Sequence, residues 1–463
     1  MRLATGYAAL FLLLCSLVSG CRTSPLAFVK RASVIQITPR TAFVDEPVRI
    51  VLRHFPANQP ITVNASFTDE RGVVWESHAN FLTDQHGQVD VATQVPLSGT
   101  YQRADAAGLF WSMTPMPGSN APELIPITLK PIHYQFAALL QTQTVAQAMM
   151  DRLYLALGVQ RISVHENGLR GTLFLPAGGG VHPGIIVLSG SEGGASEARA
   201  AFLAAKGYVA FALAYFNYED LPPYLENIPL EYFQTGIHWL EARPDVRPGG
   251  IAVLGGSRGA ELALVLGSMF PDIRAVVAIA PSSVVWGGLG TNRVLSPAWT
   301  WQGQPIPHMS EGQLTPEQAE KVARLSKTDP FIETPLMEIF LENPAKVESA
   351  AIPVEKINGP VLLVSGDEDD LWPSTPMANQ IMARLKRAGH PFPDRQLVYA
   401  GAGHFIPFPN FPATINSVVH PVTKERLMLG GEPGPTATAA VDSWAQIIGF
   451  LNANYSDKAT QKP

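Results

Sequence analysis

The chain has 463 residues, of which 46% are hydrophobic and 16% charged, and its formal net charge is −6. This length predicts two or three domains, and the hydrophobic content excludes global disorder. The 33 basic residues are outnumbered by 39 acidic ones, which argues against a nucleic-acid partner, because phosphate binding requires a basic surface.

The first 21 residues have the organisation of a bacterial export signal. Arg2 supplies a positive charge, the range 7–17 is apolar, and residues 18–21 (Val-Ser-Gly-Cys) form a cleavage site of small residues. The apolar range is short for a membrane span, which needs ~20 residues. Val-Ser-Gly-Cys also resembles a lipobox, whose cysteine becomes lipidated and N-terminal. We therefore expect a signal peptide over residues 1–20 and lipid attachment at Cys21; a plain secretory signal and an uncleaved anchor are the alternatives.

This leader predicts an exported bacterial lipoprotein that is anchored to a membrane and faces the periplasm. Cys15 and Cys21 are the only cysteines, so the cleaved chain would keep one and form no internal disulfide. We expect no metal and no cofactor, because the sequence contains no metal-binding motif.

Residues 33–130 consist of short segments with alternating apolar residues, separated by turns at intervals of roughly 8–12 residues. This spacing indicates a β-sandwich of immunoglobulin-like type. The strand-like segments are 34–37, 48–52, 61–65 and 72–75. Residues 131–159 are interpreted as a connector, helical over 135–158.

Residues 160–455 show the pattern of a second domain. A hairpin is predicted over 160–175, with Asn167-Gly168 at its turn. Continuous apolar strands then alternate with helices, which predicts a parallel sheet covered on both faces. The expected strands are 184–189, 208–213, 251–254, 275–279, 361–364 and 396–399. Residues 281–359 interrupt this alternation and are interpreted as an insertion that caps the sheet.

Residues 255–259 (Gly-Gly-Ser-Arg-Gly) match the G-x-S-x-G pattern of a nucleophile elbow. They follow an expected strand and precede an expected helix, as such a turn requires. Glycines two positions before and after Ser257 allow the tight turn that lifts the hydroxyl above the sheet, and the helix N-terminus favours negative charge nearby. Ser257 is therefore the candidate nucleophile.

The remaining catalytic groups are expected after later strands. Hydrolases of this type place their acid three residues after the glycine that ends a strand, here Gly366, which selects Asp369 and leaves Asp367 and Asp370 as alternatives. His404 follows the last expected strand, among small residues that let its ring turn towards the serine. The order Ser257, Asp369, His404 is that of the α/β-hydrolases. The predicted fold class is therefore α/β: an α/β-hydrolase domain preceded by an immunoglobulin-like β-sandwich.

The chemistry of such a triad assigns each residue a role. His404 takes the proton of Ser257, Ser257 attacks a carbonyl carbon, and Asp369 orients and stabilises the imidazole. An oxyanion hole needs two donors. The first is the backbone N–H of Arg258, and the second is expected from residues 190–194; we favour Ser191, with Glu192 as the alternative.

With these residues located, the chain resembles the acyl-CoA thioesterase / bile acid-CoA:amino acid N-acyltransferase family over most of residues 33–455. The likeness includes the two-domain organisation and the segments 214–222, 230–233, 352–355, 366–372 and 441–444. The resemblance implies cleavage of acyl-CoA thioesters through an acyl-enzyme. In the family a serine nucleophile goes with hydrolysis and a cysteine with acyl transfer, so Ser257 indicates hydrolysis.

The export signal conflicts with this substrate, because the family meets acyl-CoA inside cells. The expected partner is therefore a small acyl ester or thioester, acyl-CoA included. Three alternative functions stay open: a carboxylesterase acting on oxygen esters in the periplasm, an amino-acid N-acyltransferase, and a non-catalytic acyl-binding lipoprotein.

Overall fold

The computed structural model describes residues 31–118, 128–290, 296–309, 315–325 and 327–456. The predicted signal peptide and Cys21 lie outside these residues. From Ser33 onward the described residues form one compact unit. In this part of the chain no helix is both long and apolar enough to cross a membrane.

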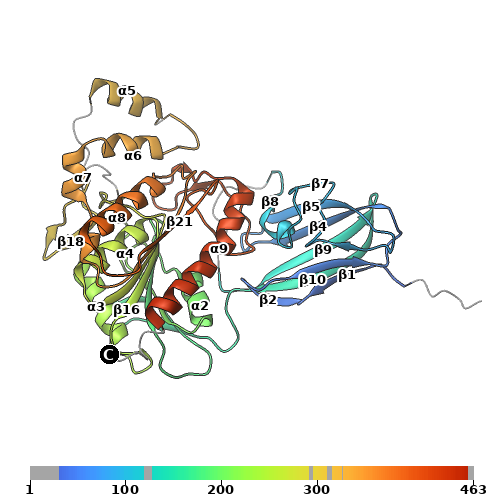
Figure 1. Cartoon of the computed structure of the whole chain (residues 1–463), viewed down its shortest axis with the longest axis horizontal. Helices are drawn as coiled ribbons and strands as arrows, with labels where there is room; N and C mark the ends of the chain where they lie inside the picture. The colour runs from blue at the N-terminus through green and yellow to red at the C-terminus, as the bar shows by residue number, and fades with distance from the viewer. Residues whose placement is uncertain (1–30, 119–127, 291–295, 310–314, 326, 457–463) are drawn as a thin grey trace, which may run out of the picture. The chain divides into compact units, whose positions relative to one another are not determined.

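The N-terminal region consists of two β-sheets that share one hydrophobic core (Figure 1). One sheet has the strand order β1-β3-β6 and the other β2-β10-β9-β4-β5-β7, with β8 paired to β5. Inward and outward side chains alternate along β4, as expected for a strand with one buried face. The immunoglobulin-like type of this sandwich stays a prediction. The elements are β1 (Val34–Thr38), β2 (Thr41–Phe43), β3 (Arg49–Arg53), β4 (Pro60–Thr68), β5 (Val74–Leu82), β6 (Val89–Asp90), β7 (Ser98–Gly99), α1 (Gly108–Trp111), β8 (Thr114–Pro115), β9 (Ile132–Leu140) and β10 (Gln143–Leu153).

The predicted helical connector within 131–159 is wrong. β9 and β10 form an antiparallel pair there, and β9 also pairs with β4, so both strands belong to the sandwich. Tyr134, Phe136 and Ala138 are buried at every second position of β9. The many alanines and methionines of this range suit a helix by local preference, but pairing with β4 and burial against the sandwich core override that preference.

The second region contains an eight-stranded sheet in the order β11-β12-β14-β13-β16-β17-β20-β21. β12 runs antiparallel to its neighbours β11 and β14, whereas the pairs from β14 to β21 are parallel. This confirms the predicted hairpin and the α/β-hydrolase class. The strands are β11 (Gln160–Val164), β12 (Arg170–Leu175), β13 (Gly184–Leu188), β14 (Val209–Ala214), β16 (Ile251–Gly256), β17 (Ile273–Ile279), β20 (Val361–Gly366) and β21 (Arg395–Tyr399).

Helices cover both faces of this sheet. Alternate residues of β13 belong to different cores: Ile185 and Val187 pack with α2 and α9, and Ile186 and Leu188 pack with α3, α4 and α8. In Figure 1 the long red α9 crosses the same side of the sheet as α2. The helices are α2 (Glu197–Ala205), α3 (Leu230–Glu241), α4 (Arg258–Met269), α8 (Ser374–Ala388) and α9 (Pro433–Leu451). The continuously apolar strands are explained by this burial on both faces.

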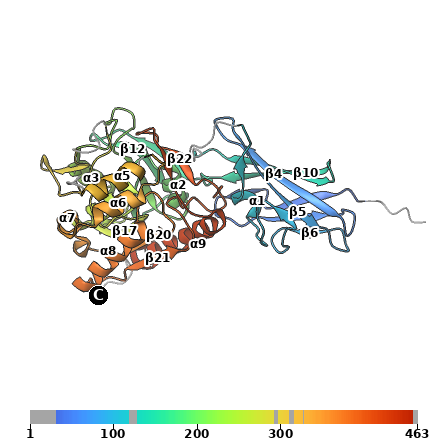
Figure 2. The same ribbon diagram turned by 90° about the horizontal axis from the view of Figure 1, so that it is seen from above.

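The range 281–359 between β17 and β20 contains most of the helices and strands that lie outside the eight-stranded sheet and the helices covering it. Its helices α5 and α6 lie over one end of the sheet in both views (Figures 1 and 2). A second excursion, between β21 and α9, was not predicted and contains the hairpin β22–β23. These elements are β15 (Ile228–Pro229), which precedes the insertion and pairs with β18, and β18 (Trp299–Trp301), β19 (Gln304–Pro305), α5 (Pro316–Leu325), α6 (Thr334–Leu341), α7 (Pro344–Ala350), η1 (Val354–Lys356), β22 (Ser417–Val419), β23 (Arg426–Met428) and, after α9, η2 (Asn452–Ser456).

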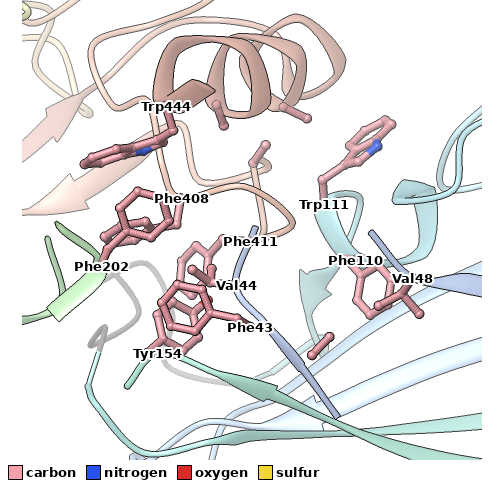
Figure 3. Packing of buried hydrophobic residues seen from close by; sticks show 14 of the residues in the cluster. Phe43, Val44, Val48, Phe110, Trp111, Tyr154, Phe202, Phe408, Phe411 and Trp444 are labelled. Atoms are coloured by element: carbon pink, nitrogen blue, oxygen red, sulfur yellow. The ribbon is translucent and has the colours of Figure 1, made fainter. Parts of the chain in front are cut away.

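The sandwich and the sheet domain share one continuous hydrophobic cluster. Phe43 of β2 stacks on Phe202 of α2 at 5.8 Å between ring centroids, and Phe202 meets Trp444 of α9 at 5.0 Å (Figure 3). Lys206 adds an ion pair to Asp45 at 2.6 Å. The sandwich is therefore packed against the face of the hydrolase domain that α2 and α9 cover.

Candidate active site

Ser257 occupies a sharp turn between the end of β16 and the start of α4. Its backbone has φ +56° and ψ −124°, a conformation that non-glycine residues rarely adopt. A Cβ atom on Gly255 would lie 2.0 Å from the Gly259 oxygen, and one on Gly259 would lie 2.2 Å from the Ser189 oxygen. At both positions a side chain would collide with backbone atoms, so only glycine fits. This explains why the G-x-S-x-G pattern has glycine two residues before and two residues after the serine.

The structure brings Ser257, Asp369 and His404 into one hydrogen-bonded chain. His404 Nε2 lies 3.0 Å from Ser257 Oγ, and His404 Nδ1 lies 2.9 Å from Asp369 Oδ2. Because the carboxylate only accepts, Nδ1 carries the proton and Nε2 is free to accept from the serine hydroxyl. The Asp369 and His404 side chains are both buried. The arrangement is that of a nucleophile, a base and an orienting acid.

Asp369 is held by several donors besides His404. Its Oδ1 accepts from the Leu371 and Trp372 backbone N–H groups at 3.0 and 3.1 Å, and its Oδ2 accepts from Ser374 Oγ at 2.6 Å. These hydrogen bonds fix the orientation of the carboxylate towards His404.

The two alternative acids have other surroundings. Asp367 Oδ1 accepts from the Gly401 N–H at 2.7 Å. Burial and the neighbouring charge of Asp369 raise the pKa of Asp370. Of the three candidate carboxylates, Asp369 is the one that hydrogen-bonds His404.

The loop of residues 190–194 lies directly against Ser257, since a Cβ on Gly190 would be 3.3 Å from Ser257 Cβ. Ser191 lines the same two cavities as Ser257, and its hydroxyl is hydrogen-bonded to His420 Nε2 at 2.9 Å. Glu192 Oε1 instead accepts from the Gly190 N–H at 3.0 Å, within its own loop. The Arg258 N–H stands at the first turn of α4, where backbone donors are unpaired.

Residues 216–222 support this loop. Asn217 Nδ2 donates to the Glu192 carbonyl at 2.9 Å, and the Gly194 N–H donates to the Phe216 carbonyl at 3.0 Å. Asp220 forms a bidentate ion pair with Arg170 of β12, with contacts of 2.7 and 2.8 Å. The contacts of Asn217 to Asp220 are thus with the loop and the sheet rather than with Ser257.

Sequence reasoning missed a buried ion pair beside the nucleophile. Arg258 lies 2.8 Å from Glu261, and Glu261 also accepts from Trp299 Nε1 at 2.8 Å. Burial raises the pKa of Glu261 to about 6. Arg258 donates further to the carbonyls of Trp286 and Gly287. The sequence signal that could have revealed this pair is Glu261, a charged residue among the apolar residues at the start of the helix that follows Ser257.

Two cavities open at Ser257. The first is mainly apolar, and most of its walls come from the 281–359 insertion: Trp286, Leu289, Met309, Leu336, Met337 and Phe340, with Leu371, Trp372 and Leu427 from elsewhere. The second lies between His404, the 190–194 loop and the 418–429 segment, and it includes Arg199. Burial lowers the pKa of Arg199. The described residues contain no group of three or more metal-ligating side chains.

Comparison with known proteins gives two family matches. Residues 228–457 match the model described as "BAAT / Acyl-CoA thioester hydrolase C terminal", and residues 45–166 match "Acyl-CoA thioester hydrolase/BAAT N-terminal region". Acyl-coenzyme A thioesterase 1 of Mus musculus is 32% identical, over 88% of this chain and 93% of its own length. The corresponding protein of Homo sapiens is 32% identical, again over 88% and 93%.

Among solved structures, similarity is lower. A hyperthermophilic esterase from Pyrobaculum calidifontis has a TM-score of 0.39 and 17% identity, covering 64% of this chain and 85% of its own. A puromycin-hydrolysing peptidase of Mycobacterium tuberculosis has a TM-score of 0.41 and 13% identity, covering 84% and 53%.

Proposed function

Since the chain belongs to the acyl-CoA thioester hydrolase/BAAT family, we propose that it is a serine hydrolase that cleaves acyl-CoA thioesters through an acyl-Ser257 intermediate. The observation that carries this proposal is the hydrogen-bonded chain from Asp369 through His404 to Ser257, opening onto an apolar cavity. The family supplies the substrate class, and the site geometry supplies the chemistry.

Acylation begins with attack of Ser257 Oγ on the thioester carbonyl carbon. His404 Nε2 takes the hydroxyl proton as the bond forms, and Asp369 stabilises the resulting imidazolium. The negative charge on the carbonyl oxygen is stabilised by the Arg258 N–H and by the loop that contains Ser191. When this tetrahedral intermediate collapses, the C–S bond breaks, the thiol leaves with the proton from His404, and the acyl group stays on Ser257.

Deacylation repeats these steps with water. His404 takes a proton from a water molecule, the water oxygen attacks the acyl carbon, and Ser257 leaves with the proton returned by His404. The product is a free carboxylic acid. Water is in large excess, so transfer to an amino acid would compete with hydrolysis only where an amine is bound next to the acyl group.

The first cavity suits an acyl chain. Its apolar walls include Met337 and Phe340 of α6, both provided by the insertion. Burying methylene groups there would contribute about 0.8 kcal/mol per CH2. We propose that this cavity holds the acyl chain.

The place of action is a separate proposal that rests on the leader alone. We propose that residues 1–20 are removed and that Cys21 carries a lipid that anchors the enzyme to a membrane, facing the periplasm. Mass spectrometry of the native N-terminus tests this: a lipidated Cys21 supports it, and an unmodified Met1 overturns it. If the enzyme is exported, an oxygen ester is the second candidate substrate.

A substrate panel on the chain from Arg22 onward separates these functions. We expect kcat/KM for palmitoyl-CoA to exceed that for p-nitrophenyl palmitate. A large excess for the oxygen ester would instead indicate the carboxylesterase. An amide product in the presence of glycine would indicate acyl transfer. Absence of turnover, together with a Ser257 that does not react with a fluorophosphonate, would identify a binding protein.

A further inference from the structure

His420 lies at the candidate active site and has no role in the mechanism above. It follows β22 in the 418–429 segment, is buried, and lines both cavities that meet at Ser257. Its Nε2 lies 2.9 Å from Ser191 Oγ, joining two segments 229 residues apart. We propose that His420 is a positioning residue that turns the Ser191 hydroxyl towards the oxyanion, as a donor additional to the backbone N–H groups. This inference rests on the proposed serine hydrolase function.

The hydrogen bonds of His420 determine its tautomer. The Thr423 N–H donates to His420 Nδ1 at 3.1 Å, and the Val422 N–H donates to the same atom at 3.3 Å. A ring nitrogen that accepts from backbone carries no proton, so the proton of a neutral imidazole is on Nε2. His420 Nε2 is therefore the donor in the contact with Ser191, and Ser191 Oγ is the acceptor.

This direction has a consequence for the Ser191 proton. A hydroxyl that accepts from a fixed N–H directs its own hydrogen elsewhere. In the described part of the chain, His420 Nε2 is the one hydrogen-bond partner of Ser191 Oγ. Ser191 lines the two cavities that it shares with Ser257, so we infer that its hydrogen points into them. The hydroxyl is thereby oriented in advance towards the place where the carbonyl oxygen becomes negative.

Such preorientation matters most in the transition state. A donor that needs no reorganisation stabilises the developing charge more than it stabilises the neutral carbonyl of bound substrate. Loss of this donor should therefore lower kcat and leave KM nearly unchanged. A hydroxyl free to rotate would lose part of this advantage, which is why His420 should affect catalysis through Ser191.

His420 also closes the turn 420–423, and the test must separate the two roles. His420→Asn keeps an acceptor for the Val422 and Thr423 N–H groups, because asparagine forms this type of turn readily. Its shorter side chain does not reach Ser191. His420→Ala, which loses both the turn acceptor and the donor, serves as the comparison and should lower Tm.

The experiment measures kcat and KM for palmitoyl-CoA in Ser191→Ala, His420→Asn and the double variant. We expect each single variant to lower kcat, Ser191→Ala on the order of 100-fold, with KM nearly unchanged. The double variant should match Ser191→Ala. An unchanged kcat in Ser191→Ala, or in a folded His420→Asn, overturns the proposal. So does a loss of kcat from His420→Asn that is equally large when Ser191 is already alanine.

If His420→Asn does not fold, His420→Gln replaces it and is compared with His420→Ala. A higher kcat in His420→Gln than in His420→Ala supports the proposal if it is seen only when Ser191 is present. The same gain in the Ser191→Ala background overturns it.

A second readout needs no natural substrate. The rate at which a fluorophosphonate modifies Ser257 also depends on stabilising negative charge on oxygen, and mass spectrometry follows it directly. If the wild-type chain hydrolyses no acyl-CoA while the variants slow this modification, the substrate assignment fails and the role of His420 stands. If the modification rate is unaffected in Ser191→Ala, the role of His420 fails independently of the substrate.

Discussion

The Arg258 guanidinium group lies 2.8 Å from the Glu261 carboxylate, and both side chains are buried on the helix that begins immediately after Ser257. Arg258 also donates to the carbonyls of Trp286 and Gly287, and Glu261 accepts from Trp299 Nε1. The pair therefore connects the insertion that lines the apolar cavity to the helix that follows the candidate nucleophile, Ser257.

Replacing Arg258 should reveal the cost of leaving its partner without a counter-charge. We expect Arg258→Met to lower the free energy of unfolding by about 3 to 5 kcal/mol at pH 8, because the buried Glu261 carboxyl group would lose its counter-charge. The substitution keeps the backbone N–H at position 258. Denaturant unfolding checks this, and the double variant Arg258→Met/Glu261→Gln should recover part of the loss. If Arg258→Met and the double variant were equally stable, the loss would not come from the ion pair between Arg258 and Glu261.

Glu261 should also make stability depend on pH. Its pKa is raised from 4.5 to about 6 in the folded chain. Between these values the folded protein keeps a proton that the unfolded chain has lost, so the contribution of Glu261 to the free energy of unfolding falls as pH rises. Glu261→Gln stays neutral and should lack this decrease. Denaturant unfolding of the wild type and of Glu261→Gln between these two pH values tests this prediction. If the free energy of unfolding changed with pH in the same way in both proteins, the prediction would be wrong.

Substitution of Ser257 should separate catalysis from backbone strain. We expect Ser257→Ala to lower kcat on the order of a million-fold without lowering Tm. Ser257→Gly should be equally inactive, yet about 1 kcal/mol more stable than Ser257→Ala, because glycine adopts the observed positive φ without strain. Turnover and thermal unfolding of both variants provide the test, and residual activity near wild type would remove Ser257 from the mechanism.

Substitutions of Asp369 and of the neighbouring Asp367 should differ sharply in their effect on kcat. Asp369→Asn is expected to lower kcat by roughly ten-thousand-fold, because the amide cannot hold His404 in the required tautomer. Asp367→Asn is the matched control, since its amide oxygen can still accept from the Gly401 N–H. It should keep nearly the wild-type kcat. Equal losses in the two variants would show that the loop as a whole, rather than Asp369, matters.

The contact between the two domains should determine stability more than activity. Phe202 is 1% exposed and packs against Phe43, Phe408 and Trp444. We expect Phe202→Ala to lower the free energy of unfolding by about 3 to 5 kcal/mol by leaving a cavity, with kcat at low temperature retained. Leu157→Ala, at a side chain 90% exposed, is the control and should change stability little. Separate melting of the domains in the wild type would contradict this coupling.

Much of the fold could be predicted because its signals are local. The parallel strands are continuously apolar, the hairpin has Asn-Gly at its turn, and the glycines around Ser257 stand where a Cβ would collide with backbone. The range 131–159 could not be read this way, since its composition favours a helix and only pairing with β4 makes it a strand. The raised pKa of Glu261 could not be predicted either, because it results from burial of the side chain in the tertiary structure.

By itself, the sequence determined Ser257 and His404 as candidates and favoured Asp369 over Asp367 and Asp370, because these residues each follow a strand, and parallel strands bring their carboxyl ends to one edge. Tertiary structure decided which carboxylate of the 367–370 run contacts His404, how Arg258 and Glu261 are buried, and that His420 meets Ser191. These contacts join segments as far apart as 229 residues. Their formation depends on the packing of the insertion and of the 418–429 segment over the sheet, which no local pattern of residues encodes.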